Sequence, residues 1–389
     1  MRRWPTKPLG EVCEFVRGIS FKPTDLVEVG SPDSLACFRT KNVQADLEAG
    51  DLLYIPRSFV RTDRQLVKEG DTLISTANSN NLVGKCCFVP PLDYPATLGG
   101  FIAAIRSDPS QMRPRFLYYW LASPPMQMRF RGLARQTTNI SNLPLTDVAK
   151  ERAPVPPLTE QERIVKLLDE ADELLKLRAQ SDHRTSALIS ALFHEMFGDQ
   201  EINPNHWPRV KVQDAVDLIN GRAFKPTEWS KSGLPIIRIQ NLKDSTAEFN
   251  HYDGQFELKH RVKKGALLIS WAGQLVSFGV HIWDGPEGVL NQHIFKVEPK
   301  LPFEIPFLQH ALSHVVEAAK SHFQGSEMKH LTRGTLDEAE VLSPPLPLQE
   351  EFTQRVTEIR KLEGAQAASR RRLEALSQSL LHCAFQGEL

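Results

Sequence analysis

The sequence predicts an α+β fold in which two similar mixed α/β domains are separated by two long antiparallel helices, which form a coiled coil with pseudo-two-fold symmetry. Three observations lead to this prediction: nearly the whole chain is duplicated, a proline-rich hinge ends each copy, and a long helical pattern follows each hinge. An internal repeat of this size fixes the architecture before any chemistry is considered, because each copy must fold as a similar unit.

The duplication is visible from the first residues of each copy. Trp4-Pro5 leads to the sequence FKPT at residues 21–24, and Trp207-Pro208 leads to an identical FKPT at residues 224–227, an offset of 203 residues. Four further segments match in the same order: Arg39–Asn42 with Arg238–Asn241, Val67–Gly70 with Val262–Gly265, Phe116-Leu117 with Phe307-Leu308, and Pro156–Glu162 with Pro344–Glu350. A colinear series of this kind predicts a shared frame with variable loops.

The two copies and their helices divide the chain into four segments. We expect the first α/β domain at residues 1–157, a central long helix at 158–200, the second α/β domain at 201–345 and a distal long helix at 346–389. Short β-type runs bounded by Gly, Pro, Asn and Asp, such as Phe101–Ile105, predict the strands of each domain.

The central helix has clear limits in the sequence. The hinge Pro154–Leu158 blocks helix formation because proline fixes φ and lacks an N–H, and Thr159–Glu162 matches a capping box that starts a helix. No proline or glycine interrupts the chain from there to Phe197. At ~1.5 Å per residue this stretch spans ~58 Å, a length typical of a coiled coil.

Alternating steps of four and three residues predict the seam between the two long helices. The seam is apolar near the ends of both helices and polar in the middle. Its predicted apolar residues are Leu167, Ala171, Leu174, Leu188 and Leu192 in the central helix, and Ile359, Leu362, Leu373, Leu376 and Leu380 in the distal helix. The alternative is two separate amphipathic helices, each lying on its own domain.

Composition bounds the class of protein. The net charge of the 389 residues is zero, and the sequence has no apolar run of the length that a membrane span needs. No apolar stretch follows the first arginines, so we expect no secretory signal. The five cysteines show neither CxxC pairing nor zinc spacing, which suits a bacterial or archaeal cytoplasm. Residues 1–157 carry 20 Lys/Arg against 15 Asp/Glu, so we expect any nucleic-acid surface to be local.

The sequence contains no convincing catalytic motif. It lacks a GxxxxGK[ST] phosphate loop, a GxGxxG after a strand and an FxGxG-type cofactor loop. His310 and His314 have helical metal spacing but lack the glutamate of HExxH and a third ligand. Ser123–Met126 and Ser343–Leu346 resemble the [DNS]-P-P-[YFW] tetrapeptide of amino-methyltransferases, but each ends in an aliphatic residue that cannot stack on a flipped base. We therefore expect no catalytic residue, no metal site and no cofactor bound by this chain.

Five motifs that occur in both copies, in the same order, carry a resemblance to a known family. They are W-P…G-x-x-F-K-P-T, R-x-x-N, K-x-G-x-x-[LI]-I-S, the hinge P-P-L-x-x-Q-E, and L-x-x-x-L-x-H-x-x-F near the end of each helix. Each motif alone is weakly specific. Together they make the chain similar, over almost its whole length, to the DNA-specificity (S) subunit of Type I restriction–modification systems.

This resemblance implies a function and a set of partners. Each α/β domain would be a target-recognition domain that reads one half of a bipartite, asymmetric site in double-stranded DNA. The paired helices would act as a spacer and bind two methyltransferase subunits, which carry S-adenosylmethionine and methylate adenine N6. Restriction/translocase subunits with ATP and Mg²⁺ would join through the complex, and the chain itself would be a non-catalytic part of a defence against foreign DNA. The alternatives are the specificity subunit of a simpler fused methylase–nuclease system, and a protein-binding adaptor that does not read DNA.

Candidate DNA-binding residues follow from the chemistry of recognition, because Arg pairs with guanine, Asn or Gln pairs with adenine, and basic runs bind phosphate. The candidates are Arg39, Lys41, Asn42, Thr76, Asn78, Ser79, Asn80, Arg129, Arg131, Arg135 and Gln136 in the first domain, and Arg238, Gln240, Asn241, Trp271, Gln274, Lys329 and His330 in the second. Runs that differ between the copies, TANSNN at 76–81 and WAGQ at 271–274, are better candidates for reading sequence than shared residues. The alternative for the shared Asn42 and Asn241 is that each caps a turn.

Overall fold

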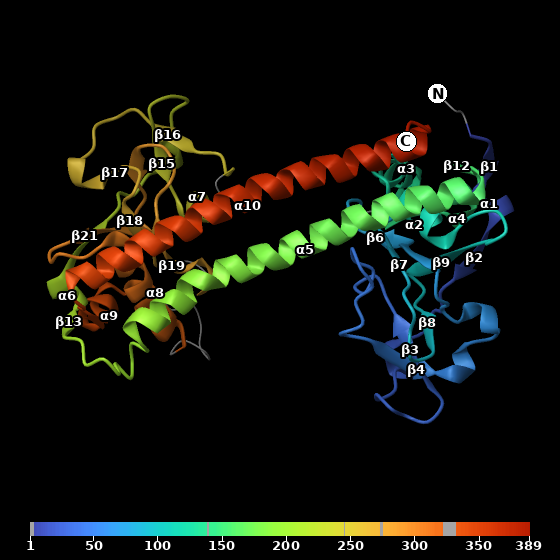
Figure 1. The fold of residues 1–389 in the computed structure, drawn as a ribbon, viewed down its shortest axis with the longest axis horizontal. Helices are drawn as coiled ribbons and strands as arrows, with labels where there is room; N and C mark the ends of the chain where they lie inside the picture. The colour runs from blue at the N-terminus through green and yellow to red at the C-terminus, as the bar shows by residue number, and fades with distance from the viewer. Residues whose placement is uncertain (1–3, 138–139, 245, 273–274, 322–331) are drawn as a thin grey trace. The chain divides into compact units, whose positions relative to one another are not determined.

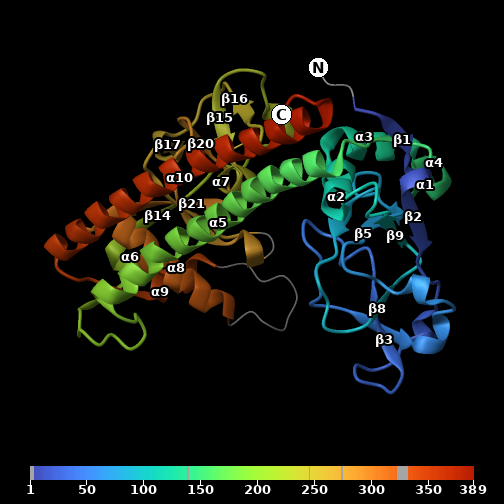
Figure 2. The same cartoon turned by 45° about the vertical axis from the view of Figure 1, so that its right-hand side comes forward.

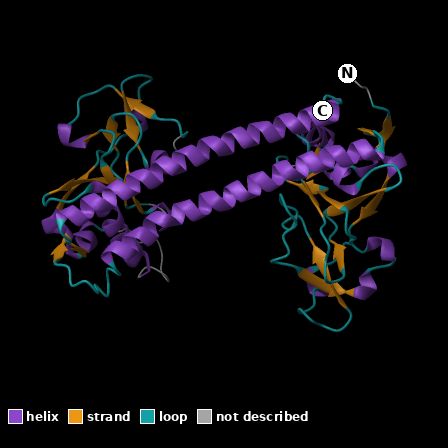
Figure 3. Cartoon of the chain, in the orientation of Figure 1, coloured by secondary structure: helices purple, strands orange, loops and turns teal. Residues whose placement is uncertain are grey.

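The computed structural model describes residues 4–137, 140–244, 246–272, 275–321 and 332–389. The chain divides into two compact units, Met1–Arg178 with Ser369–Leu389, and Ala179–Ala368. Each unit contains a globular part, a part of α5 (Leu158–Phe197) and a part of α10 (Leu346–Gln386), the two long helices labelled in Figure 1. Strands and shorter helices are mixed within each globular part, as Figure 3 shows, which confirms the predicted α+β class.

The globular part of the first unit is built from short elements. Its strands are β1 (Thr6–Pro8), β2 (Cys13–Arg17), β3 (Ser34–Phe38), β4 (Leu53–Pro56), β5 (Thr72–Ser75), β6 (Ala77–Asn78), β7 (Cys86–Phe88), β8 (Ala96–Leu98), β9 (Ile102–Ser107), β10 (Arg135–Gln136), β11 (Ser141–Asn142) and β12 (Arg152–Pro154). Its helices are α1 (Leu9–Val12), α2 (Pro114–Ala122), α3 (Pro124–Leu133) and α4 (Leu145–Val148).

The second unit repeats this order with fewer elements. Its strands are β13 (Arg209–Lys211), β14 (Val216–Asn220), β15 (Leu234–Ile237), β16 (Asn250–Tyr252), β17 (Arg261–Val262), β18 (Leu267–Ser270), β19 (Gly279–Ile282), β20 (Gly288–Leu290), β21 (Ile294–Pro299) and β22 (Glu340–Leu342). Its helices are α6 (Val212–Ala215), α7 (Ile239–Lys243), α8 (Ile305–Ser321) and α9 (Arg333–Glu338).

The main sheets of the two units share their strand order, although the second unit adds β17 at the edge of one sheet. The first unit contains a sheet of order β2-β9-β5-β7 and a sheet of order β4-β3-β8, and the second contains β14-β21-β18-β19 and β16-β15-β20-β17. In each unit the second of these sheets has one parallel pair, β3 with β8 and β15 with β20. The shared strand order confirms the duplication that the sequence predicts.

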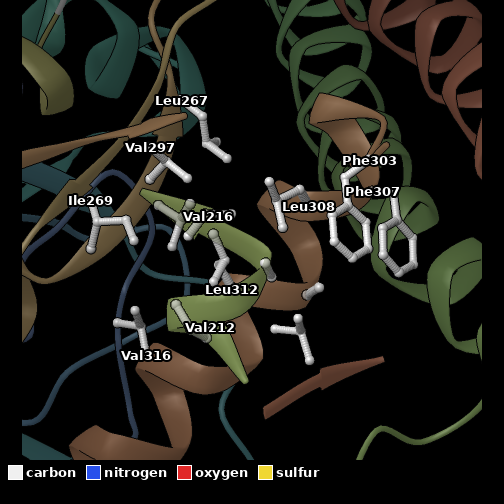
Figure 4. Close-up of a cluster of buried hydrophobic side chains, with 14 of the residues drawn as sticks. Val212, Val216, Leu267, Ile269, Val297, Phe303, Phe307, Leu308, Leu312 and Val316 are labelled. Atoms are coloured by element: carbon white, nitrogen blue, oxygen red, sulfur yellow. The ribbon is translucent and has the colours of Figure 1, made fainter. Parts of the chain in front are cut away.

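The core of the second unit lies between its first sheet and α8. Figure 4 shows Leu267, Ile269 and Val297 of the sheet facing Leu308 and Leu312 of the helix. The apolar side chains of α8 recur three and four residues apart, which places them on one face of the helix. Both Figure 1 and Figure 2 show α8 beside the end of α5 within this unit.

A buried glutamine explains why the hinge motif is repeated. In the first unit the Gln161 side-chain oxygen accepts from the backbone N–H of Arg113 (2.7 Å), and its nitrogen donates to the carbonyls of Gln111 (2.9 Å) and Pro156 (2.8 Å). In the second unit Gln349 accepts from the N–H of Glu304 (3.1 Å) and donates to the carbonyl of Pro344 (2.8 Å). Each glutamine therefore ties the start of a long helix to the hinge and to the segment before α2 or α8.

Replacing Gln349 by alanine should destabilise the second unit by about 2 kcal/mol, since the buried carbonyl of Pro344 and the partly buried N–H of Glu304 lose their partner. Urea unfolding measures the effect. Gln354→Ala is a matched control, because Gln354 lies exposed on the same helix and a surface change of this kind is expected to cost about 0.5 kcal/mol or less. Equal effects of the two substitutions would contradict the role assigned to Gln349.

The two long helices pack against each other in antiparallel directions within each unit. In the second unit Phe193 and Phe197 of α5 contact Phe352 of α10, with ring centroids 5.5 and 5.4 Å apart. Further along, the Gln366 side-chain nitrogen donates to the hydroxyls of Ser181 (3.1 Å) and Thr185 (3.0 Å). This polar contact falls where the sequence predicts a polar middle of the seam.

The first unit holds the other ends of the same helices. Ile164 and Leu168 of α5 and Ala384 of α10 belong to one buried cluster, and the ring of Phe385 lies 5.4 Å from that of Phe116 in α2. Within each unit, the ends of the two long helices therefore pack against each other and against the globular part of that unit. The prediction of paired helices is therefore confirmed, and the alternative of two separate helices is wrong.

The predicted seam is displaced by one residue at alternate positions. Four of its leucines, Leu174, Leu188, Leu362 and Leu376, are about half exposed, whereas Ile189, directly after Leu188, is buried. The remaining predicted seam residues are half-buried: Leu167, Ala171, Leu192, Ile359, Leu373 and Leu380. One residue corresponds to about 100° around a helix, so the exposed leucines lie on a different face from the buried row.

The histidine pair of α8 belongs to an aromatic cluster. The ring of Phe193 lies 5.5 Å from that of His310 and 5.7 Å from that of His314. Burial lowers the pKa of His310 to about 4, so this ring is neutral near pH 7. Both histidines therefore pack against the ring of Phe193.

Candidate nucleic-acid interface

In the first unit two loops with polar and aromatic side chains leave the same edge of a sheet. Strands β3 and β8 are parallel, with Phe38 paired to Leu98, so their carboxyl ends lie together. Arg39 and Lys41 follow β3, and Phe101 lies in the loop that follows β8. The Phe101 side chain is 63% exposed. The predicted residues Arg39 and Lys41 are therefore placed near a loop that the sequence analysis did not single out.

The TANSNN run joins this edge through the backbone of Phe101. The N–H groups of Thr76 and Ala77 donate to the Phe101 carbonyl (2.9 and 3.3 Å). Beyond Thr76, β6 pairs with β11, and β11 pairs with β10. The predicted Asn78 therefore shares a small three-stranded sheet with Arg135 and Gln136, while Ser79 and Asn80 lie exposed just beyond β6.

The basic run of the first unit lies on exposed parts of α3 and β10. Arg129 forms an ion pair with Glu151 (3.0 Å), and Arg135 lies 3.6 Å from a carboxylate oxygen of Asp147. The exposed Arg131 instead donates from Nε to the carbonyl of Gln127 (3.1 Å). A bond to a neutral carbonyl does not offset the charge, so Arg131 is the best placed of the three arginines to attract phosphate.

Arg39 and Lys41 share a carboxylate partner. Arg39 Nη2 lies 3.0 Å from Asp51 Oδ2, and Lys41 Nζ donates to the same oxygen. The hydrogen bond from Lys41 is the largest cause that holds the pKa of Asp51 below its usual value. The carboxylate of Asp51 therefore offsets only part of the charge of the two cations.

Asn42 and Asn241 hold their own loops and do not face solvent, which corrects their prediction as DNA contacts. They are only 1% and 5% exposed. The Asn42 oxygen accepts from the N–H of Arg39 (2.9 Å), and its nitrogen donates to the carbonyl of Glu48 (2.8 Å). Asn241 accepts in the same way from Arg238 (3.1 Å). The shared asparagine is therefore a turn cap, the alternative that the sequence analysis left open.

In the shared Gly-x-x-Phe-Lys segments, each glycine packs closely against the backbone of the loop that leaves the strand-end edge of its unit. A Cβ at Gly18 would lie 2.0 Å from the carbonyl oxygen of Gly99, and a Cβ at Gly221 would lie 2.1 Å from that of Asn291. Only glycine permits this approach without displacing the loop after β8 or β20. These segments therefore belong to the common frame.

In the second unit the equivalent edge contains a cavity of about 250 Å³. Strands β15 and β20 are parallel, with Ile237 paired to Leu290. The cavity is lined by Phe224, Trp229, Arg238, Ile239, Gln240, Asn291, Gln292 and His293. It therefore brings together the predicted residues Arg238 and Gln240 with three polar residues that the sequence analysis missed.

Of the four remaining candidates in the second unit, the structure describes only Trp271. Trp271 is half-buried, and its ring stacks on that of Phe295 with centroids 5.5 Å apart. Trp271 lies next to the loop 291–293, because its backbone N–H donates to the carbonyl of His293 (3.3 Å). Gln274, Lys329 and His330 lie outside the described residues.

The loops at residues 99–101 and 291–293 are what sequence reasoning overlooked. They contain Gly-Gly-Phe in the first unit and Asn-Gln-His in the second, at matching positions after β8 and β20. A signal was present, since two glycines stand directly before Phe101, the first residue of the predicted strand Phe101–Ile105, whereas β9 begins at Ile102. Their closeness to Arg39 and Arg238 depends on a parallel pairing between distant strands, which periodicity does not reveal.

Two general observations limit the kinds of site. Within the described ranges, no group of three or more His, Cys, Asp or Glu side chains is arranged to hold a metal ion. Among the helices of the same residues, none has the length and apolar character needed to cross a bilayer.

Comparison with known proteins places the chain in a family. The sequence model of the Type I restriction modification DNA specificity domain matches residues 1–183 and again 204–367. The EcoKI specificity subunit of a Type I restriction enzyme from Escherichia coli K12 is 24% identical over 433 residues, covering 99% of this chain and 89% of the relative. The StySPI specificity subunit from Salmonella potsdam is 21% identical, with the same coverage of both chains.

Solved structures show the same fold. A chain from a study of complex assembly and conformational transition of a Type I restriction–modification system superposes with a TM-score of 0.63 at 18% identity, covering 100% of this chain and 99% of that chain. The S subunit from M. genitalium superposes with a TM-score of 0.56 at 18% identity, covering 98% and 96%. With the family match over most of its length, the chain belongs to the DNA-specificity (S) subunits of Type I restriction–modification systems.

Proposed function

We propose that this chain binds double-stranded DNA and that each unit reads one half of a bipartite, asymmetric site. The observation that supports this proposal is the strand-end edge in each unit. The backbone there is the same, including Gly18 and Gly221, while the exposed side chains differ between the loops 99–101 and 291–293. Base edges are distinguished by side-chain donors and acceptors, so two equal frames with different side chains are expected to read different half-sites.

Methyltransferase subunits are the proposed partners of the long helices. Five leucines of the long helices are about half exposed: Leu174, Leu177 and Leu376 in the first unit, and Leu188 and Leu362 in the second. Grouped exposed apolar side chains mark protein–protein contact surfaces. The two methyltransferase subunits would cover these faces, and restriction subunits would join through them.

Catalysis is assigned to those partners. We propose that the methyltransferase subunits supply S-adenosylmethionine, that the restriction subunits supply ATP and Mg²⁺, and that this chain contributes binding alone in the cytoplasm, where the DNA lies. A fused methylase–nuclease partner would use the same edges of this chain. An adaptor that does not read DNA would not need different side chains on two equal frames.

Two substitutions in the first unit should separate affinity from specificity. Arg131→Ala should weaken binding to all sequences alike and reduce the salt dependence by about one phosphate contact. Asn78→Ala should instead change the preference at one half-site, by about 1–3 kcal/mol for the affected base pair. Competition among randomised DNA duplexes at two salt concentrations measures both effects on the full chain.

Arg163→Ala is the matched control for charge, because Arg163 is exposed on α5 and pairs with Glu160. We expect it to leave DNA binding unchanged. Equal losses on all sequences for Arg131→Ala and Asn78→Ala would contradict the division between phosphate and base contacts. Absence of any DNA binding by the wild-type chain, alone and with its methyltransferase subunits, would favour the adaptor.

A further inference from the structure

The cavity of the second unit is built on a rigid backbone. The N–H of Asn291 donates to the carbonyl of Ile237 (3.1 Å), and the N–H of Arg222 donates to the carbonyl of Leu290 (2.8 Å). Three chain segments are thus fixed at the carboxyl ends of two parallel strands. Side chains held on such a base present their polar groups in a constant geometry, which recognition of a specific partner needs.

The walls of the cavity combine flat apolar surfaces with few polar groups. Phe224 and Trp229 supply the aromatic surfaces. Arg238 and Gln240, at the start of α7, and Gln292, in the loop after β20, supply hydrogen-bonding groups. Recognition sites have this composition, in which a few precisely placed polar groups among apolar walls provide specificity.

Arg238, which supplies the positive charge in this cavity, has a counterpart in the first unit and so does not explain a difference in the bases that the two units read. Arg238 Nη1 donates to Asn250 Oδ1 (2.9 Å), and its guanidinium lies 5.7 Å from the centre of the Trp229 ring. Arg39 occupies the same position in the first unit and pairs with Asp51. Both units have an arginine at this position, and each arginine has a polar neighbour. Such a residue is suited to binding phosphate or to holding the loop.

The amide side chain of Gln292 is present in the second unit only. The matching position in the first unit is Gly100, one residue before the exposed Phe101. Gln292 Nε2 lies 3.1 Å from His293 Nε2, a contact that uses one of the two amide hydrogens. The other hydrogen and the carbonyl oxygen form a planar donor–acceptor pair. Adenine presents the complementary pair in the major groove, N7 as acceptor and N6–H₂ as donor.

We propose that Gln292, seated in the cavity of the second unit, reads an adenine in the half-site bound by that unit through a bidentate contact to N7 and N6. This inference rests on the proposed function, because it names the base that one of the two reading edges recognises. His293 orients the amide from the neighbouring position, and Gln240 lines the other side of the cavity.

Selection from randomised DNA duplexes by the purified full chain tests this assignment. Gln292→Ala should lower the preference for adenine at one position of one half-site by tenfold or more and leave the other half-site unchanged. Gln292→Glu should change the preferred base at the same position to cytosine, because a carboxylate accepts from cytosine N4–H₂ but cannot donate to adenine N7.

A chemical substitution in the DNA checks the same contact from the other side. Replacing that adenine by 7-deazaadenine, which lacks the N7 acceptor, should weaken binding of the wild-type chain about as much as Gln292→Ala does. It should weaken binding of the Gln292→Ala variant no further. Independent losses that multiply would show that Gln292 and N7 do not contact each other, which overturns the proposal.

The remaining outcomes are also decisive. Phe101→Ala, in the matching loop of the first unit, should change the base preference at the other half-site only. Gln354→Ala, at an exposed position of α10, should change the preference at neither half-site. A uniform loss of affinity with Gln292→Ala would identify a phosphate contact and overturn the adenine assignment, while leaving the bipartite reading intact. A wild-type chain that shows no sequence preference, alone and with its methyltransferase subunits, would instead contradict the proposed function itself.

Discussion

Replacing Phe193 by alanine should destabilise the second unit by about 3–5 kcal/mol, the usual cost of truncating a buried phenylalanine. Phe193 is 1% exposed. Its ring lies 5.0 Å from that of Phe197, 5.6 Å from that of Phe307 in α8 and 5.5 Å from that of Phe352 in α10. The substitution leaves a cavity where two long helices and the globular core meet. Urea unfolding measures the loss, and hydrogen exchange of α8 locates it in this unit.

Two neighbouring residues on the same helix provide the control. Leu188 is 46% exposed and Ile189 is 9% exposed. Leu188→Ala should therefore change stability by about 0.5 kcal/mol or less, whereas Ile189→Ala should cost about 2–5 kcal/mol. Hydrogen exchange in β9 of the first unit should stay unchanged in all three variants. Equal costs for Leu188→Ala and Ile189→Ala would contradict the buried face described here.

The architecture could be predicted because a duplication constrains every level of the fold at once. A shared motif such as P-P-L-x-x-Q-E fixes a hinge, and Gln161 and Gln349 show that the same bonds form in both copies. Proline blocks the helix before this point, and the uninterrupted stretch to Phe197 then becomes α5. Local chemistry of this kind does not depend on distant parts of the chain.

The seam could not be placed to the residue for a physical reason. Steps of four and three residues select leucines by spacing alone, so a half-exposed leucine such as Leu188 or Leu362 and a buried one look alike in sequence. The buried row also includes polar residues, since Thr185 and Gln366 meet in the second unit. The globular core decides which face turns inward, because Ile189 and Phe193 pack on α8 as well as on α10.

The candidate site shows a similar limit. Shared residues tend to be frame and different residues tend to carry function, and Asn42 and Asn241 follow this rule as turn caps. The loops that contain Phe101 and Gln292 were missed because the parallel pairing of strands brings them to Arg39 and Arg238. The contact depends on topology, which the pattern of apolar residues does not record.

Gly221→Ala should remove the preference of the second unit for its half-site. The new Cβ would lie 2.1 Å from the carbonyl oxygen of Asn291 and 2.6 Å from that of Leu290. Both atoms belong to the backbone, so the strand end and the loop that holds Gln292 must move. Overpacking of this kind costs about 1–3 kcal/mol, and the displaced loop no longer presents its side chains in a fixed geometry. Selection from randomised DNA should show that half-site relaxed tenfold or more and the other half-site unchanged.

Two further glycine substitutions make this expectation specific. Gly18→Ala introduces the same clash in the first unit, where the new Cβ would lie 2.0 Å from the carbonyl oxygen of Gly99, and should relax the other half-site instead. Gly334→Ala lies in α9, where a Cβ has no heavy atom within 4 Å, so it should leave reading intact and stabilise the helix by up to about 1 kcal/mol. Because the two clashing variants act on matching positions, reciprocal losses would tie each half-site to one strand-end edge. If both variants altered the same half-site, or if Gly221→Ala left the preference of its own unit intact, the edges after β8 and β20 would not be where sequence is read.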